Sequence, residues 1–110
     1  MAKRNRILIG KTTPSYSLKG AKKLIRKNKI ICLKTVIDST NNMCLTISQA
    51  HQEILKLKAK DFYKSVPDKR NNNIWQDVYK KEIKGFPIYI KFKIGAGNFL
   101  LMSFKPDESK

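Results

Sequence analysis

The segment from Phe86 to Ile94 alternates between apolar and other side chains, which is typical of a strand with one buried face. If its apolar residues face the core, Tyr89, Lys91 and Lys93 share the opposite face. Ammonium groups at this spacing can hold RNA phosphates, and the tyrosine can stack on a base or supply a hydroxyl. The alternative is an ordinary outer face of a sheet, on which tyrosine and lysine are common. The strand alone does not decide between the two.

If the chain cleaves RNA, few catalytic mechanisms are open to it. It has a single histidine, His51, and we expect no tight carboxylate cluster for Mg²⁺, so neither a two-imidazole nor a metal-dependent mechanism is favoured. The remaining route uses the RNA 2′-hydroxyl as nucleophile, with cations to stabilise the phosphorane and one group to donate or accept a proton. Lysine, glutamine and tyrosine can fill these roles, and a positive field is expected to lower a tyrosine pKa from about 10. We predict no cofactor and no metal.

The charge balance points to a polyanionic partner. Lysine and arginine number 24 against 8 acidic residues, giving a formal net charge of +16. Such an excess opposes folding by self-repulsion, so nucleic acid is favoured as partner, with an anionic membrane or an acidic protein as alternatives. No apolar run is long enough to cross a membrane, and residues 1–10 lack the apolar core of a signal peptide. We therefore expect a cytoplasmic protein without membrane association.

The remaining reactive side chains favour structural roles. Cys32 and Cys44 stand in apolar surroundings without metal-ligand spacing, so we expect two buried, reduced thiols rather than a zinc site. His51 falls on or beside the apolar stripe of a helix that follows Thr46. A packed histidine is favoured there over a catalytic one.

The elements that must position these residues form one domain over residues 1–110, with a basic, mobile arm at 1–14 and a charged tail at 106–110. We expect a helix from Ser17, a buried strand within 30–37, a loop at 38–42, and a helix that begins with a Thr46–Gln49 capping box. Four strands are predicted at 62–66, 78–83, 86–94 and 99–104. This order predicts an α+β fold, with two N-terminal helices packed on a twisted antiparallel sheet.

Three segments in this C-terminal half resemble the MqsR family of toxins: DFYKS at 61–65, IWQDVY at 74–79, and IYIK at 88–91. Residues 100–105 are also similar to that family's closing strand. The resemblance implies a RelE-like fold and a bacterial type II toxin that cleaves single-stranded mRNA without the ribosome. It further implies inhibition by a cognate antitoxin, typically a zinc-containing protein that binds DNA.

The resemblance also implies site residues. The family's catalytic positions correspond to Lys64 for phosphate and transition-state stabilisation, Gln76 for orienting the scissile phosphate or the 2′-hydroxyl, and Tyr89 as general acid or base. Of these three residues, only Tyr89 is also predicted by the strand pattern, without the resemblance. We expect Trp75 to anchor the core and Tyr79 to lie on a sheet face. The predicted RNA-binding residues are Tyr63, Lys69, Arg70, Lys80, Lys91 and Lys93.

Two other functions fit the composition. A non-catalytic basic RNA-binding protein would bind RNA in a salt-dependent way without cutting it. A protein whose charge serves an acidic protein partner would do neither. Strand scission by the purified chain separates the enzyme from both.

Overall fold

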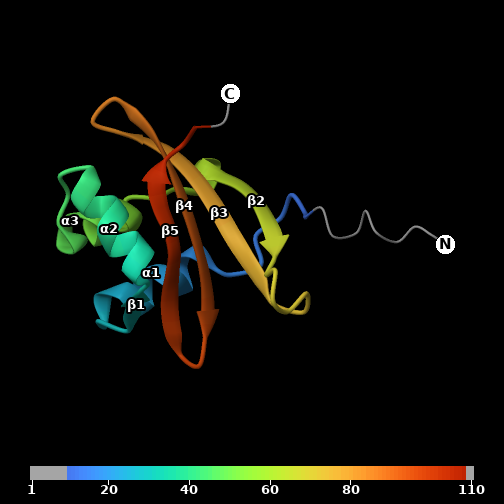
Figure 1. Cartoon of the computed structure of the whole chain (residues 1–110). Helices are drawn as coiled ribbons and strands as arrows, with labels where there is room; N and C mark the ends of the chain where they lie inside the picture. The colour runs from blue at the N-terminus through green and yellow to red at the C-terminus, as the bar shows by residue number, and fades with distance from the viewer. Residues whose placement is uncertain (1–9, 109–110) are drawn as a thin grey trace.

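A computed structural model describes residues 10–108, in which three helices pack on one side of a five-stranded sheet (Figure 1). The spatial order of the strands is β1-β5-β4-β3-β2. The elements in chain order are α1 (Leu18–Arg26), β1 (Ile30–Cys32), α2 (Lys34–Asn42), α3 (Ile47–Leu55), the short 3-10 helix η2 (Ala59–Asp61), β2 (Phe62–Pro67), β3 (Trp75–Ile83), β4 (Phe86–Gly95) and β5 (Asn98–Pro106). The predicted α+β class is confirmed, and the layout is compatible with the RelE-like fold that the resemblance implies.

The sheet is mixed rather than antiparallel throughout. Strands β2 to β5 form the expected antiparallel meander, but β1 pairs with β5 in parallel, from Ile30 opposite Phe99 to Cys32 opposite Leu101. Between β1 and β5 the chain passes through helices and three further strands. This long connection allows β5 to run beside β1 in the same direction. The expectation of a purely antiparallel sheet was wrong in this one strand.

Helix α2 occupies a segment for which the sequence predicted the end of a strand and a loop. Its polar composition favours neither a strand nor a long helix, but Val36 and Thr40 stand four residues apart on one helical face. Both are fully buried, and α2 packs along β5. Tertiary packing of this face therefore overrides the weak local preference, and the domain has three helices rather than two.

The other two helices match their sequence signals. Helix α1 begins at Ser17, whose hydroxyl accepts from the Gly20 amide, and it buries Ala21 and Ile25. At α3, the Thr46 hydroxyl accepts from the Gln49 amide at 3.0 Å and the Gln49 side chain accepts from the Thr46 amide at 2.8 Å. This reciprocal pair confirms the predicted capping box.

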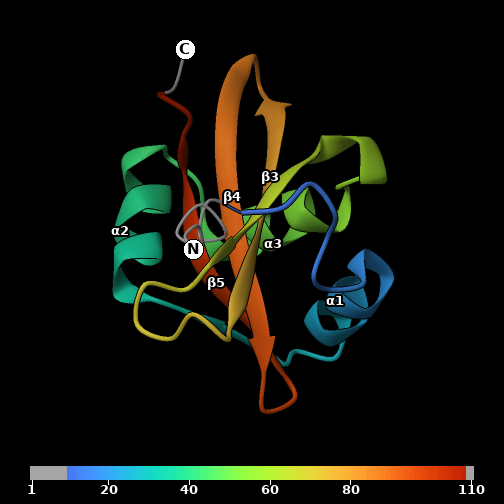
Figure 2. The same ribbon diagram turned by 90° about the vertical axis from the view of Figure 1, so that its right-hand side faces the viewer.

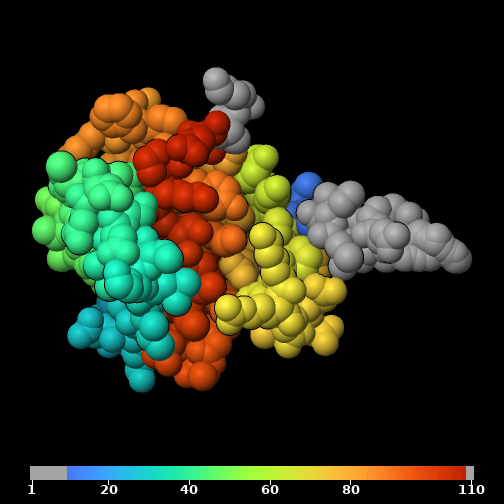
Figure 3. Space-filling model, in the orientation of Figure 1, coloured from blue at the N-terminus to red at the C-terminus, as the bar shows by residue number. Residues whose placement is uncertain are grey.

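The core lies between the helices and the inner face of β3, β4 and β5. Figure 3 shows the helices in direct contact with β5. Phe92 is stacked between Tyr79 and Phe99, with ring centroids 5.8 Å and 4.6 Å away. Tyr79 is only 1% exposed, whereas Trp75 is half-buried at the start of β3. The expected roles of these two aromatic residues are therefore reversed.

The chain before α1 is bound to the sheet over its described part. The Lys11 amide and carbonyl exchange hydrogen bonds with Ser65 of β2 at 2.8 and 2.9 Å. The buried Asp77 carboxylate accepts from the amides of Ser15 and Tyr16. Lys11 of the predicted mobile arm is thus paired with the sheet, while residues 1–9 of that arm lie outside the described chain. At the other end of the chain, the Asp107 amide donates a hydrogen bond to the Pro87 carbonyl. Residues 109–110 also lie outside the described chain.

Two further observations concern the thiols and membranes. Cys32 is half-buried, but Cys44 is exposed, so the expectation of two buried thiols is wrong for Cys44; both are free thiols. Cys44 follows the last turn of α2 with a positive φ of 60°, at a corner that turns away from the core. Within residues 10–108, no helix has the length and apolar character needed to span a membrane.

Candidate active site

The face of the sheet turned away from the core carries the candidate residues. Register pairs Lys80 of β3 with Tyr89 of β4, and Val78 with Lys91, so all four share the side opposite the buried Tyr79 and Ile90. Figure 2 views the molecule from the side remote from α3. We call this surface the open face; its residues are Lys64, Val66, Gln76, Val78, Lys80, Glu82, Pro87, Tyr89, Lys91, Lys93, Leu100, Ser103 and Lys105. The predicted outward orientation of Tyr89, Lys91 and Lys93 is confirmed.

A β-bulge brings Lys64 onto the open face. Phe62 pairs with Tyr79 and contacts its ring edge-on at 5.4 Å on the core side. In a regular strand, Lys64 would point to that same side, but it pairs with Val78 because Tyr63 is an extra, unpaired residue. Bulges shift the side-chain alternation in this way. Tyr63 itself is 48% exposed.

A second bulge adds a lysine that the sequence analysis did not identify. In β5, Leu101 pairs with Phe92 and Ser103 with Lys91, which leaves Met102 as the extra residue. Beyond it, Lys105 pairs with Tyr89, and its Nζ lies 5.4 Å from the centroid of that ring. Because the strand was predicted to end at Phe104, Lys105 was not predicted to lie beside Tyr89.

The three predicted catalytic residues lie on three adjacent strands and face the same side. Register and regular strand spacing put the Cα of Lys64 about 8 Å from that of Gln76 and about 12 Å from that of Tyr89, with Gln76 and Tyr89 about 14 Å apart. Val78 and Lys91 lie between the two ends of this row. The groups therefore share one surface but are spread over the length of about two nucleotides, with Gln76 at one end.

An aromatic platform flanked by cations occupies the other end. Lys80 Nζ lies 3.8 Å from the ring centroid of Tyr63, and Lys64 Nζ lies 5.2 Å from it. Lys80 also forms an ion pair with Asp107 at 3.2 Å. An exposed ring close to ammonium groups can stack on a base while the lysines hold phosphates.

The pKa of Tyr89 is raised, not lowered as the sequence analysis expected. Burial is the largest cause, followed by the neighbouring Tyr63 phenol and the Asp107 carboxylate. The lysines around the ring do not outweigh the loss of solvent, because desolvation penalises the phenolate. Tyr89 is therefore a neutral phenol at physiological pH, which suits a proton donor.

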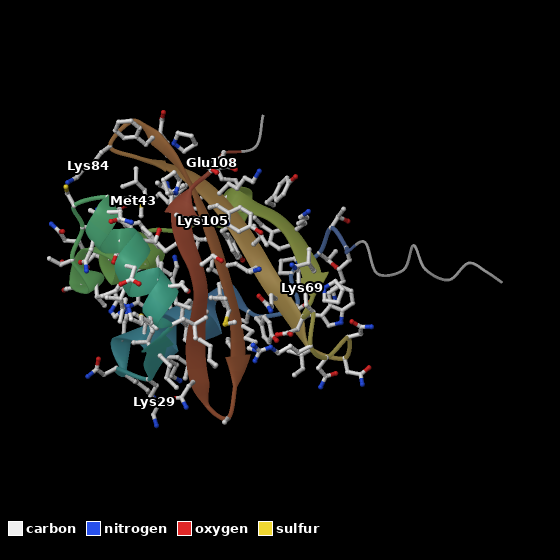
Figure 4. All side chains as sticks on the ribbon, viewed as in Figure 1. Lys29, Met43, Lys69, Lys84, Lys105 and Glu108 are labelled. Carbon is white, nitrogen blue, oxygen red and sulfur yellow. The ribbon has the colours of Figure 1, made fainter. Side chains whose placement is uncertain are left out.

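Lys91 is the central cation of the open face. It is half-buried, and its pKa is lowered by burial first and then by the charges of Lys105 and Lys69. In Figure 4, Lys69 lies beyond the end of β2 and Lys105 near the end of β5. Cations from two strands and a loop thus meet around one position, which favours an anionic ligand.

Gln76 lies in a separate polar cluster with two charged residues. Its Nε2 donates to Asp68 Oδ2 at 2.8 Å, and Lys93 Nζ donates to the same oxygen at 2.9 Å. The hydrogen bonds from Lys93 and from the Arg70 amide lower the pKa of Asp68 to about 2. Asp68 was not among the predicted site residues, and Lys93, predicted to bind RNA, has its charge paired with that carboxylate.

His51 is far from this surface in the fold. It lies on α3, on the helix-covered side, with Nε2 3.6 Å from Cys32 Sγ. Burial lowers its pKa, as expected for a packed imidazole. No group of three or more histidine, cysteine, aspartate or glutamate side chains suited to a metal ion occurs between residues 10 and 108.

The amino-acid sequence is similar to those of known proteins. The sequence model of the family described as motility quorum-sensing regulator, toxin of MqsA, matches residues 13–106. The chain is also 28% identical over 95 residues to the mRNA interferase toxin MqsR of Escherichia coli (strain K12). That alignment covers 86% of this chain and 96% of the relative. The matched span contains every helix and strand described above, and the chain therefore belongs to the MqsR toxin family.

Proposed function

We propose that this chain is the toxin of a type II toxin–antitoxin system and an endoribonuclease that cleaves single-stranded mRNA in the cytoplasm. The family and the name of its relative, an mRNA interferase, support this function. The observation that carries it is the common orientation of Lys64, Gln76 and Tyr89 on a lysine-rich face. A single strand can lie along such an open surface, with its bases stacked on aromatic side chains and its phosphates held by lysines.

The proposed reaction is an internal transesterification that needs no metal. The 2′-oxygen attacks the adjacent phosphorus and its proton passes to solvent, while the bond from phosphorus to the 5′-oxygen breaks. Lys64 stabilises the charge of the phosphorane, and the neutral Tyr89 phenol donates a proton to the leaving 5′-oxygen. Solvent then reprotonates Tyr89. The products are a 2′,3′-cyclic phosphate and a 5′-hydroxyl.

The remaining predicted residues bind the strand. Tyr63 stacks on a base beside the scissile phosphate, and Lys80, Lys91, Lys69 and Arg70 attract the flanking phosphates. Lys69 and Arg70 are exposed in the loop between β2 and β3. Because Lys93 is paired with Asp68, its contribution is to local structure more than to phosphate binding.

The proposed protein partner is a cognate antitoxin that binds this chain and blocks it. An antitoxin with an acidic surface would complement the formal net charge of +16. A zinc-containing, DNA-binding antitoxin is the form that the family resemblance implies.

Incubation of the purified chain with a single-stranded RNA in excess EDTA tests the function. We expect fragments that end in a 2′,3′-cyclic phosphate, and protection of the RNA when the same sequence is annealed into a duplex. Retention of the RNA without scission would instead identify a non-catalytic RNA-binding protein. Fragments formed only with added Mg²⁺ would contradict the metal-independent route.

A further inference from the structure

The side chain of Gln76 is held at one end and unsatisfied at the other. Gln76 is 6% exposed, and its Nε2 donates to Asp68 Oδ2 at 2.8 Å. Its Oε1 is buried and accepts no hydrogen bond from residues 10–108. A buried acceptor without a donor costs free energy, so an unsatisfied one in a polar cluster calls for a reason.

The Asp68 carboxylate fixes the orientation of the Gln76 side-chain amide. An ionised carboxylate only accepts hydrogen bonds, so the amide nitrogen must face it and the amide oxygen must point elsewhere. A flipped amide would bring two acceptors together. The orientation of Gln76 is thus fixed by chemistry rather than left open, as the orientation of a solvent-exposed amide would be.

Asp68 is itself fixed from three sides. Lys93 Nζ donates to Oδ2 at 2.9 Å, the Arg70 amide donates to Oδ1 at 2.8 Å, and the Asp68 amide donates to the Ile74 carbonyl at 2.8 Å. The ion pair with Lys93 also neutralises a carboxylate that would otherwise repel RNA. A negative charge is therefore kept on a strongly positive face without opposing its ligand.

We propose that Asp68 is a positioning residue, which holds Gln76 so that its Oε1 accepts a hydrogen bond from the 2′-hydroxyl of the bound RNA. This inference rests on the proposed function and assigns the 2′-hydroxyl, not the phosphate, as the partner of Oε1. A phosphodiester oxygen is only an acceptor, so it cannot bond to Oε1, whereas the 2′-hydroxyl is a donor. Oε1 is covered in the free protein, so the hydroxyl reaches it when neighbouring side chains move on RNA binding. DNA offers no such donor.

Asp68→Asn tests this assignment, with Glu82→Gln as its matched control. Both remove one negative charge, but Glu82 is exposed and outside the polar cluster. Single-turnover cleavage at increasing enzyme concentration gives the maximal rate and the half-saturating concentration. For Asp68→Asn we expect a maximal rate lower by about tenfold or more. The half-saturating concentration should be unchanged or lower, because the substitution leaves the Lys93 ammonium group unpaired and free to attract a phosphate. Glu82→Gln should keep the wild-type maximal rate.

The outcomes separate the two proposals. If the wild type does not cleave RNA, the proposed function fails. If the wild type cleaves and Asp68→Asn has the same maximal rate, or loses rate and affinity together as a damaged fold would, the positioning role is overturned.

A second measurement does not depend on the variant's folding. In the wild type, the assigned side-chain NH₂ resonances of Gln76 should show one proton shifted downfield and protected from exchange by the Asp68 carboxylate. RNA should shift these resonances more than a DNA oligonucleotide of the same sequence, because only RNA carries the 2′-hydroxyl that donates to Oε1. Free exchange of both protons, or equal shifts with RNA and DNA, would contradict the proposal.

Discussion

Phe62 and Lys64 point to opposite sides of the sheet although they stand two residues apart in one strand. Phe62 packs edge-on against Tyr79 in the core, and Lys64 lies opposite Val78 on the open face. The extra residue Tyr63 reverses the alternation between them, and its own ring lies close to the ammonium groups of Lys64 and Lys80. One irregular position in β2 thus supplies both a base-stacking ring and a phosphate-binding lysine, as bulges beside functional sites commonly do.

Replacement of Lys64 should slow cleavage without unfolding the protein. We expect Lys64→Ala to reduce the maximal cleavage rate by about 10²-fold, because the ammonium group stabilises charge that develops in the transition state. Lys19→Ala, which removes an exposed lysine on α1, is the matched control and should cleave as the wild type does. Equal rates for the two variants would remove Lys64 from the mechanism.

Tyr89→Phe should separate binding from chemistry. Loss of the hydroxyl removes the proton donor, so we expect about 10²-fold slower cleavage with nearly unchanged RNA affinity. Since the pKa of Tyr89 is raised, the phenol stays protonated and the ratio of wild-type to Tyr89→Phe rates should stay constant from about pH 6 to about pH 9. A ratio that climbs with pH would instead identify Tyr89 as a phenolate base.

The platform formed by Tyr63 should contribute to affinity more than to rate. Tyr63→Leu keeps an apolar side chain but removes the ring, so RNA binding should weaken by about 1–3 kcal/mol. The rate at saturating enzyme should change little. Phe86→Leu, at a ring that is 68% exposed by the β3–β4 turn, is the control and should bind RNA normally. Titrations of a fluorescent single-stranded RNA compare the two.

Asp68 should make the stability of the domain depend on acid pH. Its pKa lies at about 2 in the folded chain, below the ordinary value of 3.8. The native state therefore favours the carboxylate, and its stabilisation is present above about pH 4 and lost as the pH falls toward 2. We expect about 2 kcal/mol of acid-dependent unfolding free energy from this group. Urea unfolding of the wild type and Asp68→Asn at several acid pH values should converge as the pH falls, and parallel curves would disprove the linkage.

Asp77 should anchor the segment before α1. Its fully buried carboxylate accepts from the amides of Ser15 and Tyr16. Asp77→Ala should lower the free energy of unfolding by about 3 kcal/mol, because it leaves buried amides without acceptors. Asp38→Ala, which removes an exposed partner of Lys34, should cost less than about 1 kcal/mol. Amide hydrogen exchange at Ser15 and Tyr16 should rise only in the Asp77 variant.

The sequence by itself determined the features that depend on short-range periodicity and capping. The alternation from Phe86 to Ile94 identified the open face of β4, and the Thr46–Gln49 pair marked the start of α3. Both signals act over a few residues, through strand pleating in one case and unpaired helix amides in the other. The fold class followed from the order of such elements.

Only the tertiary structure decided which residues meet across elements. Helix α2 forms because Val36 and Thr40 are buried against β5, and the bulges at Tyr63 and Met102 turn Lys64 and Lys105 to the open face. The bond between Gln76 and Asp68 likewise joins β3 to the start of the β2–β3 loop, and Lys93 comes from β4. The local sequence does not encode such contacts, because burial and cross-strand register depend on partners that the chain brings close only when the sheet is complete.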